Sequence, residues 1–299
     1  MSANTQKIIC IGSVLWDIIG TTNASLSRAS DEPGQIKMLP GGVAFNIAQK
    51  LCMLGYKSTI LTAIGKDPEG QALIDRCKQI GLEASYIFRP EDWPTDRYMA
   101  IEDADGVVAA IAHAHSLEAA GDLILKPLKD GRLGSLVKPF DGMIVLDGNL
   151  SDEVLEEISV SPYFAACDLR LCPASPGKGK RLKPFFGHKN ATFYCNLQEA
   201  EILCGAEFNT AEAAVLGLLR MGAKRAIVTH GGLTVCDGRA LKRPVLYAPP
   251  KIEVQRVTGA GDTFMAAHLA AEIEKLSAEQ ALKQAVEAAA AFVNGKDNA

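Results

Sequence analysis

The amino-acid sequence predicts an α/β fold in which helices flank a mainly parallel sheet, and two observations support this prediction. Apolar runs of strand length alternate along the chain with stretches of helical period, which is typical of a parallel sheet with crossover helices. One region, residues 97–113, breaks the alternation and reads as two strands with no helix between them. We therefore expect a single domain over residues 1–299, with a small β-sheet standing off the main one.

The elements follow in order from the N-terminus. A strand at "KIICIGSV" precedes a helix at "VAFNIAQKLCMLG", and the pair repeats as "STILTAIG" and "EGQALIDRCKQIG". Both helical stretches end at a glycine, Gly55 and Gly81, which suits the left-handed conformation that ends many helices. Asp105 and Gly106 form a tight-turn signal between the two strands of the exceptional region. Later strands are expected at "GMIVLDG", "TFYC" and "RAIVTHGG", and the Pro/Gly/Lys-rich passage 172–190 is expected on the surface.

Composition narrows the classes of function. The chain has 299 residues, 48% of them hydrophobic, and a formal net charge of -4, which gives no general electrostatic attraction for nucleic acid. No apolar run reaches the roughly 18 residues of a membrane span, and the N-terminal stretch lacks a signal-peptide pattern, so we expect a cytoplasmic protein. The eight cysteines form no CxxC pair and are expected to pack as reduced thiols rather than to bind zinc or form disulfides.

The stretch "VTGAGDTF" carries the first chemical signal. Gly259 and Gly261 stand at the head of an alanine-rich helical stretch, where small residues let a ligand approach backbone N–H groups and the positive end of the helix dipole. Asp262 follows on the first turn, where a carboxylate could accept a proton from an attacking hydroxyl. An anion cradle beside a base suggests phosphoryl transfer. An ordinary glycine turn with a favourable first-turn acid explains the same residues.

Several further motifs distinguish these alternatives. No GxxxxGK[ST] occurs and no GxGxxG follows the first strand, which argues against the common phosphate-loop and nicotinamide-dinucleotide folds. The stretches "GGVAFNIAQKLCMLG" and "VTGAGDTFMAAHLAA" resemble the N- and C-terminal signatures of the ribokinase-like (PfkB) carbohydrate kinases. "AIGKDPEG" (63–70), "NLQEAEIL" (196–203) and "AIVTHGG" (226–232) are similar to further motifs of that family, in its order. The resemblance implies a three-layer α/β/α fold, ATP as phosphoryl donor and an alcohol group as acceptor.

The resemblance assigns roles on the ATP side of the site. It implies that Asp262 is the catalytic base and that the backbone amides of Gly259, Ala260 and Gly261 form the anion hole. Asn196 and Glu199 match an N-x-x-E pair that organises Mg²⁺, Glu199 acting indirectly through water; a helix cap and a first-turn acid are the alternative explanation. The residues expected to contact ATP are Asn196, Glu199, Thr229, Gly231, Thr258, Gly259 and Gly261.

Four residues are implied on the acceptor side: Asp17, Gly41, Gly42 and Asn46. A carboxylate, an amide and exposed backbone suit vicinal hydroxyls, although Asp17 could instead cap a turn and Asn46 could be a tolerated polar helix residue. Segments near 17–22, 34–40 and 97–113 resemble the family's lid, which closes over the acceptor and excludes water. In several relatives this lid forms the dimer contact, so a homodimer is expected.

Other residues bear on the cation and the acceptor. Arg256 stands where the family has an aspartate at a monovalent-cation site, which argues against potassium activation, and Trp16 replaces an asparagine common before the acceptor-binding aspartate. The segments "GVVAAIAHAHSLE" (106–118) and "DLRLCPASPGKGKRL" (168–182) look like those of bacterial pseudouridine kinases. That resemblance makes pseudouridine the leading acceptor, with a fructokinase- or ribokinase-type sugar kinase and a catalytically weak binding protein as alternatives. His113 and His115 are expected on the surface or lid rather than at a metal, and one of them could contact a nucleobase.

Overall fold

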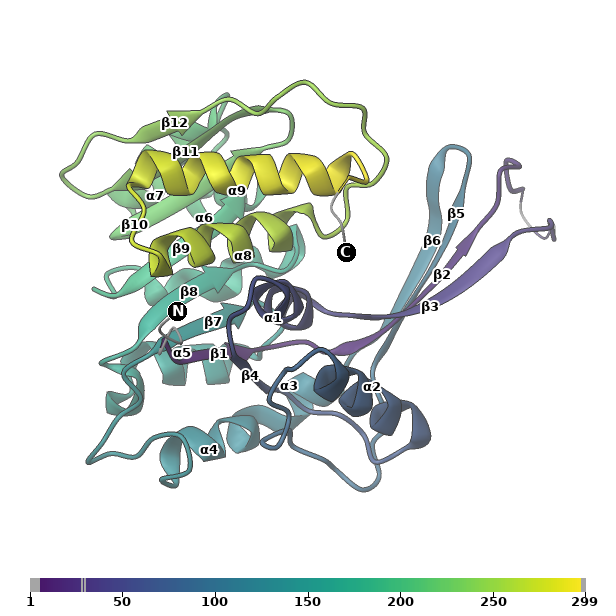
Figure 1. The fold of residues 1–299 in the computed structure, drawn as a ribbon, viewed down its shortest axis with the longest axis horizontal. Helices are drawn as coiled ribbons and strands as arrows, with labels where there is room; N and C mark the ends of the chain where they lie inside the picture. Colours follow the sequence, from purple (N-terminus) through teal and green to yellow (C-terminus); the bar gives the residue numbers. More distant parts are fainter. Residues whose placement is uncertain (1–5, 28, 30, 297–299) are drawn as a thin grey trace.

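The computed structural model describes residues 6–27, 29 and 31–296, and an eight-stranded sheet forms its centre (Figure 1). Neighbouring strands from β4 to β10 run parallel, and β11 and β12 continue the sheet antiparallel. In spatial order the strands are β12 (Val245–Tyr247), β11 (Leu233–Arg239), β10 (Arg225–His230), β9 (Ala191–Asn196), β8 (Asp168–Cys172), β7 (Met143–Asp147), β1 (Ile8–Ile11) and β4 (Ser58–Leu61).

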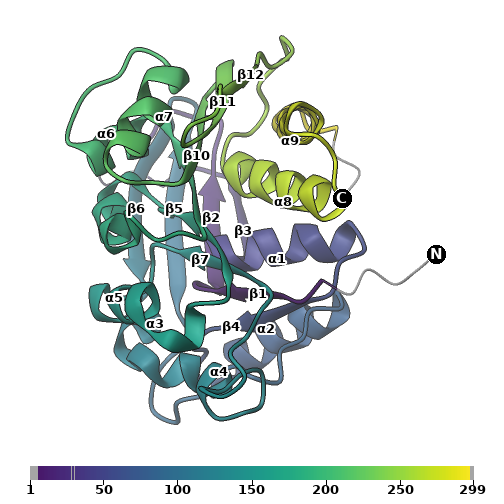
Figure 2. The same ribbon diagram turned by 90° about the vertical axis from the view of Figure 1, so that its left-hand side faces the viewer.

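Helices cover both faces of this sheet, which gives three layers (Figure 2). Because side chains alternate along a strand, Ile8 and Cys10 of β1 pack into one core and Ile9 and Ile11 into the other. One face carries α1 (Val43–Met53), α2 (Pro68–Gln79), α8 (Ala260–Ile273) and α9 (Ala278–Val293). The other carries α3 (Ser116–Ala120), η1 (Gly121–Leu125), α4 (Lys126–Lys129), α5 (Asp152–Val160), η2 (Pro162–Phe164), η3 (Pro176–Phe185), α6 (Leu197–Cys204) and α7 (Ala211–Arg220).

A second sheet of four strands, which we call the lid, extends from the main body (Figure 1). Its order is β3 (Gln35–Gly41), β2 (Leu15–Thr21), β5 (Arg97–Asp103) and β6 (Gly106–His113). The hairpin expected around Asp105 and Gly106 is present: β5 and β6 pair antiparallel, and Gly106 has a φ of 121°. Since only three residues separate the end of β1 from the start of β2, the main sheet leads directly into the lid.

The passage 172–190 corrects one expectation from the sequence. It was expected on the surface, but its middle forms η3, and the Leu182 and Phe185 side chains are completely buried in the core beneath α5 and α6. The lysines and prolines of the passage hid these two apolar anchors, which are three residues apart and so fall on one side of a 3₁₀ helix.

Across the described residues, no helix has both the length and the apolar character needed to cross a bilayer.

Candidate active site

A cavity of ≈ 370 Å³ opens where the parallel strands end and the lid begins. Such a position, beyond the carboxyl ends of the strands, is where open α/β sheets bind ligands. The cavity brings together residues that are far apart in the sequence. Of the residues singled out from the sequence, it is lined by Asp17, Gly42, Asn46, Asn196, Glu199, Thr229, Thr258, Gly259, Gly261 and Asp262. Gly41, Gly231 and Ala260 are not among its lining residues.

Asp262 lies in the first turn of α8, with its carboxyl group facing the cavity. Burial raises the pKa of Asp262 to about 7. The amide of Asn46 opposes the rise by donating a hydrogen bond from Nδ2 to Asp262 Oδ2 at 2.8 Å. The negative charges of Asp147, Glu199 and Asp17 add to the rise. A carboxyl group poised near neutrality can exist as a base at physiological pH and can also hold a proton.

Asn46 therefore has a role that the sequence did not reveal. The residue was expected to hold hydroxyls of the acceptor, and it does line the cavity from the first turn of α1. Its amide nitrogen is directed to Asp262, 216 positions away, so Asn46 also orients the Asp262 carboxyl group. The Asn46 side-chain oxygen is left as the group able to face an acceptor.

The backbone ahead of α8 has the shape expected of an anion cradle, with one qualification. Gly259 caps the helix at φ 90°, in the left-handed region that favours glycine, and no side chain occupies the cap. The Ala260 N–H donates to the Val257 carbonyl at 3.0 Å, so this amide is engaged within the turn. An anion at this helix end would meet the Gly259 and Gly261 backbone and would have to share or displace the Ala260 bond.

Asn196 and Glu199 meet at the start of α6. Asn196 Oδ1 accepts a bond from the Glu199 amide at 2.9 Å, and Glu199 Oε2 accepts one from the Asn196 amide at 2.8 Å. This reciprocal capping box was the alternative explanation for the pair, and both residues also line the cavity. Burial raises the pKa of the Glu199 carboxyl group, which lies at the cavity wall. The box fixes one Glu199 oxygen and leaves the other for a cation or its waters.

Asp17 and the two glycines pack tightly at the base of the lid. A Cβ at Gly41 would lie 2.0 Å from Asp17 Oδ2, so Gly41 is needed to make room for the carboxylate. Gly42 caps α1 at φ 103°, and a Cβ there would lie 2.3 Å from the Ser13 carbonyl. Burial raises the pKa of Asp17 to about 6. Gly41 thus acts through Asp17, whereas Gly42 lies at the cavity itself.

The sequence did not single out Asp147, a buried carboxylate that joins several segments at the site through hydrogen bonds. This carboxylate, fully buried at the end of β7, accepts hydrogen bonds at Oδ2 from the Ser13 amide, the Ser13 hydroxyl and the Ala44 amide, at 2.8, 2.9 and 3.2 Å. Its other oxygen accepts from the Asn149 amide at 2.9 Å. It ties the β1–β2 connection to the N-terminus of α1, where both acceptor-side elements begin. An acid directly after the apolar strand "MIVL" was the available signal.

The donor set suits a magnesium-bound nucleotide. Asp17, Glu199 and Asp262 bring three carboxyl groups to one cavity, each with a pKa raised chiefly by burial, and a divalent cation would relieve that cost. In the part of the chain that the structure describes, no group of three or more His, Cys, Asp or Glu side chains could hold a metal by itself. The carboxyl groups at this cavity fit Mg²⁺, which takes one or two carboxylates and completes its shell with water and phosphate oxygens.

Three residues singled out from the sequence do not line this cavity. Arg256 Nε donates to the Phe292 carbonyl at the end of α9 at 2.9 Å, and its guanidinium lies 3.8 Å from the centre of the Phe292 ring. His113 and His115 lie at the base of β6 with their ring centres 5.7 Å apart, and neither lines the cavity. The cavity wall also contains residues that were not named as site residues from the sequence, including Cys172 at the end of β8 and Pro173 and Ala174 after it.

Comparisons with known proteins show the family and the fold of this chain. Residues 5–297 match the family model described as pfkB family carbohydrate kinase. Guanosine-inosine kinase of Exiguobacterium acetylicum is 29% identical over 98% of this chain and 96% of its own length. Pseudouridine kinase of Escherichia coli is 29% identical over 87% of this chain and 81% of its own. A solved carbohydrate kinase from Agrobacterium tumefaciens superimposes with a TM-score of 0.81 at 27% identity, covering 98% of this chain and 94% of that one. The predicted three-layer fold with a small second sheet is confirmed.

Proposed function

This chain belongs to the pfkB family of carbohydrate kinases and is an ATP-dependent kinase with an alcohol acceptor, and from that premise we propose that it phosphorylates the 5′ hydroxyl of a nucleoside, most of all pseudouridine. The observation that supports the chemistry is Asp262, a carboxyl group with a pKa of about 7 at the head of a glycine-capped helix. Likeness to a pseudouridine kinase and to a guanosine-inosine kinase supports a nucleoside acceptor.

The proposed mechanism assigns one task to each group at the cavity. Asp17 and the Asn46 side-chain oxygen hold acceptor hydroxyls, while the Asn46 amide keeps Asp262 oriented. Asp262 takes the proton of the attacking hydroxyl. The Gly259 and Gly261 backbone, with Ala260 once its turn bond is shared, stabilises charge on the transferred group at the positive end of α8.

The ATP side follows from the opposite wall. Bound ATP with Mg²⁺ would supply the γ-phosphoryl group and neutralise charge on its oxygens. Glu199 would hold the cation through water, with Asn196 fixing the Glu199 carboxylate through the capping box. Thr229 and Thr258 line the cavity as hydroxyl donors to the nucleotide, and Gly231, at the turn after β10, would allow its close approach. Arg256 brings a positive charge near the anion cradle, so we expect no potassium requirement.

Closure of the lid would complete the site. Asp17 lies on β2 at the point where the lid leaves the main sheet, so movement of the lid would carry this carboxylate with it. A closed lid would exclude water that otherwise competes as acceptor. The face of the lid opposite Asp17 carries five exposed apolar side chains: Ile36, Met38, Met99, Ile101 and Ile111. This apolar surface supports a homodimer formed through the lid.

The experiment that tests this function measures ATP consumption by the purified protein with Mg²⁺ across a panel of acceptors. The panel compares pseudouridine, uridine, guanosine, inosine, ribose and fructose at equal concentration. We expect selective turnover of pseudouridine. Preference for guanosine or inosine would move the base specificity towards the purine-nucleoside relative. Preference for ribose or fructose would leave the chemistry standing and overturn the nucleoside acceptor.

The variant Asp262→Asn tests the mechanism in the same assay. Removing the base should lower kcat by roughly 10²- to 10⁴-fold while ATP binding persists. Asp75→Asn, an exposed carboxylate on α2, is the matched control and should keep full activity. Near-normal turnover by a folded Asp262→Asn protein would contradict the assignment of the base. ATP binding without turnover of any acceptor by the unaltered protein would favour a catalytically weak binding protein.

A further inference from the structure

A second cavity, of ≈ 470 Å³, lies at the opposite end of the main sheet from the candidate active site. Its lining includes Asp168, Ala191 and Arg225, the first residues of β8, β9 and β10. The candidate active site instead uses the ends of the same strands, at Cys172 and Asn196. The two cavities are therefore separated by the length of these strands, and nothing in the proposed kinase mechanism uses the second one.

Strand register places a row of basic residues along this cavity. Arg170 of β8 pairs with Thr192 of β9, Thr192 pairs with Arg225 of β10, and Arg225 pairs with Arg239 of β11. Residues directly opposite each other on neighbouring strands point to the same face of a sheet. Four adjacent strands thus contribute three arginines and one threonine to a single line, and all four residues line the cavity.

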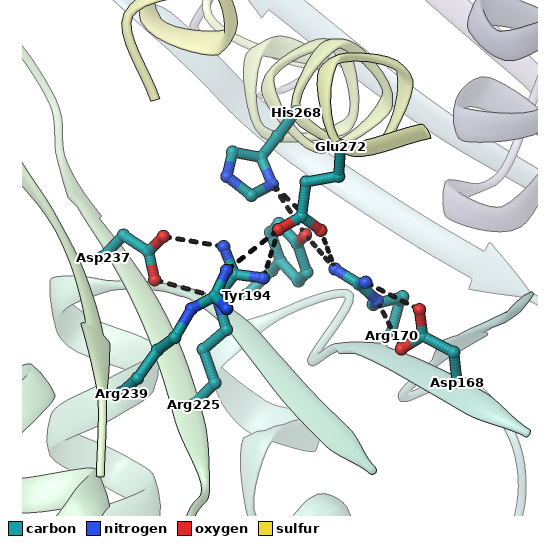
Figure 3. A network of polar contacts seen from close by, with 8 residues as sticks. All are labelled: Asp168, Arg170, Tyr194, Arg225, Asp237, Arg239, His268 and Glu272. Atoms are coloured by element: carbon teal, nitrogen blue, oxygen red, sulfur yellow. Dashed lines mark hydrogen bonds and ion pairs between the residues drawn. The ribbon is translucent and has the colours of Figure 1, made fainter. Parts of the chain in front are cut away.

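Two of the arginines are held by carboxylates (Figure 3). Arg170 binds Asp168 through two bonds of 2.8 and 2.7 Å, and Arg225 binds Asp237 through two bonds of 2.9 and 2.7 Å. Both also contact Glu272, which reaches down from the last turn of α8. These bidentate pairs occupy most of the donors on both guanidinium groups.

Arg239 is held much less firmly than its two neighbours. Its one ion pair among the described residues is with Glu272, at 3.3 Å, and Glu272 already contacts Arg170 and Arg225. The Arg239 side chain is 41% exposed, compared with 9% for Arg170 and Arg225. Several of its guanidinium N–H groups are therefore free to meet a ligand.

Lys189, Lys224 and Thr192 add further donors. Both lysines are exposed at the cavity, and neither makes an ion pair within residues 6–27, 29 and 31–296. Thr192 is only 6% exposed, and no residue in the described part of the chain hydrogen-bonds its hydroxyl. Counting the arginine row and both lysines, five cations face three carboxylates, Asp168, Asp237 and Glu272, which leaves an excess of two positive charges.

We propose that this cavity binds the phosphate group of a small metabolite or free inorganic phosphate, held by Arg239, Lys224 and the Thr192 hydroxyl. A phosphate near neutral pH carries up to two negative charges, which matches the excess of two positive charges. The planar guanidinium suits its oxygens in a bidentate arrangement, and lysine adds a flexible point charge. The ligand would meet Arg239 next to Glu272. Glu272 lies on α8, the helix that also carries Asp262.

Calorimetry with inorganic phosphate tests the proposal on the full chain. The test variant is Lys224→Gln with Arg239→Gln. The matched control is Lys242→Gln with Arg243→Gln, which removes two exposed cations from the β11–β12 connection outside the cavity. Any phosphate bound at the candidate active site is common to all three proteins. We expect the unaltered protein and the control to bind one phosphate more per chain than the test variant. Equal stoichiometry and affinity in all three would overturn the site.

Two further arms sharpen the result. Thr192→Val removes one hydroxyl while preserving the shape of the strand, and it should weaken phosphate binding several-fold without loss of kinase activity. Unchanged binding would contradict the role of the buried hydroxyl. Glycerol 3-phosphate is titrated alongside inorganic phosphate: tighter binding that the test variant loses identifies a phosphomonoester, whereas weaker binding identifies free phosphate. Kinase turnover of each variant shows that it is folded.

Discussion

At the scale of single residues, Asp262 as the proposed base should set the pH dependence of the reaction. Burial raises the pKa of Asp262 to about 7, while the hydrogen bond from Asn46 favours its charged form and holds the pKa down. A base acts only when deprotonated, so kcat/KM for the acceptor should fall as pH drops below about 7. Asn46→Ala should move this limb to higher pH.

The measurement is a pH–rate profile from about pH 5 to 9, with ATP saturating. Asn209→Ala, an exposed residue before α7, is the control and should leave the midpoint where it is in the unaltered protein. Because Asn46 lines the cavity and is also proposed to hold the acceptor, KM is expected to rise in Asn46→Ala. The midpoint of the limb separates the two roles, and an unshifted midpoint would leave Asn46 as an acceptor ligand only.

Gly41 provides a second prediction at this scale. A Cβ there would lie 2.0 Å from Asp17 Oδ2, so Gly41→Ala must push the Asp17 carboxylate aside. We expect a higher KM for the acceptor with little change in KM for ATP. Gly20→Ala is a close control on β2, because its Cβ would meet only the Ala100 carbonyl, at 3.9 Å. An unaltered acceptor KM in Gly41→Ala, or an equal rise in Gly20→Ala, would contradict the role of Asp17.

At the scale of elements, α8 connects the candidate active site with the arginine row. Asp262 and Glu272 are ten residues apart on one helix, a separation of about 15 Å along its axis. Glu272 stands in the last turn, where an acid opposes the helix dipole, yet Arg170 and Arg225 hold the pKa of Glu272 down to about 2. The arginines thus outweigh the effect of burial on the pKa of this carboxyl group.

Removal of this charge should destabilise the whole domain. Glu272→Gln leaves two buried guanidinium groups short of a partner, which is expected to cost about 3–5 kcal/mol in the free energy of unfolding. A depressed carboxyl pKa stabilises the fold fully above the unfolded value, near 4.5, and the contribution is lost as pH falls towards 2. The deficit of Glu272→Gln in urea unfolding should therefore shrink over that range. Glu253→Gln, at an exposed position, should be neutral throughout.

The elements also show what the sequence could predict. Strand and helix positions follow local periodicity, and the anion cradle follows three consecutive residues, so both could be read from short stretches. Asp147 could not, because its partners Ser13 and Ala44 lie 134 and 103 positions away. The row from Arg170 to Arg239 depends on the register of four strands, which no local pattern sets. The features that the sequence could not predict are therefore the long-range contacts between polar groups.

At the scale of the whole molecule, the lid has two unlike faces. Register places Asp17, Tyr98 and Ala112 on the face that leads to the cavity. The opposite face carries Ile36, Met38, Met99, Ile101 and Ile111, which are between 40% and 80% exposed. Exposed apolar side chains gathered on one sheet favour association, and a stable dimer typically buries about 800 Å² on each partner. A second copy of the lid, turned face to face, supplies a matching surface.

The variant Met38→Glu with Ile111→Lys tests the proposed dimer. It introduces charges on the apolar face while sparing the Asp17 face, so we expect a monomer by sedimentation where the unaltered protein is a dimer. The pair Leu123→Glu with Leu136→Lys, at exposed positions outside the lid, is the matched control and should remain dimeric. Because the lid is also proposed to close over the candidate active site, the monomer should show a raised KM for the acceptor. A monomeric unaltered protein, or a dimer that survives both charges, would place the contact elsewhere or remove it.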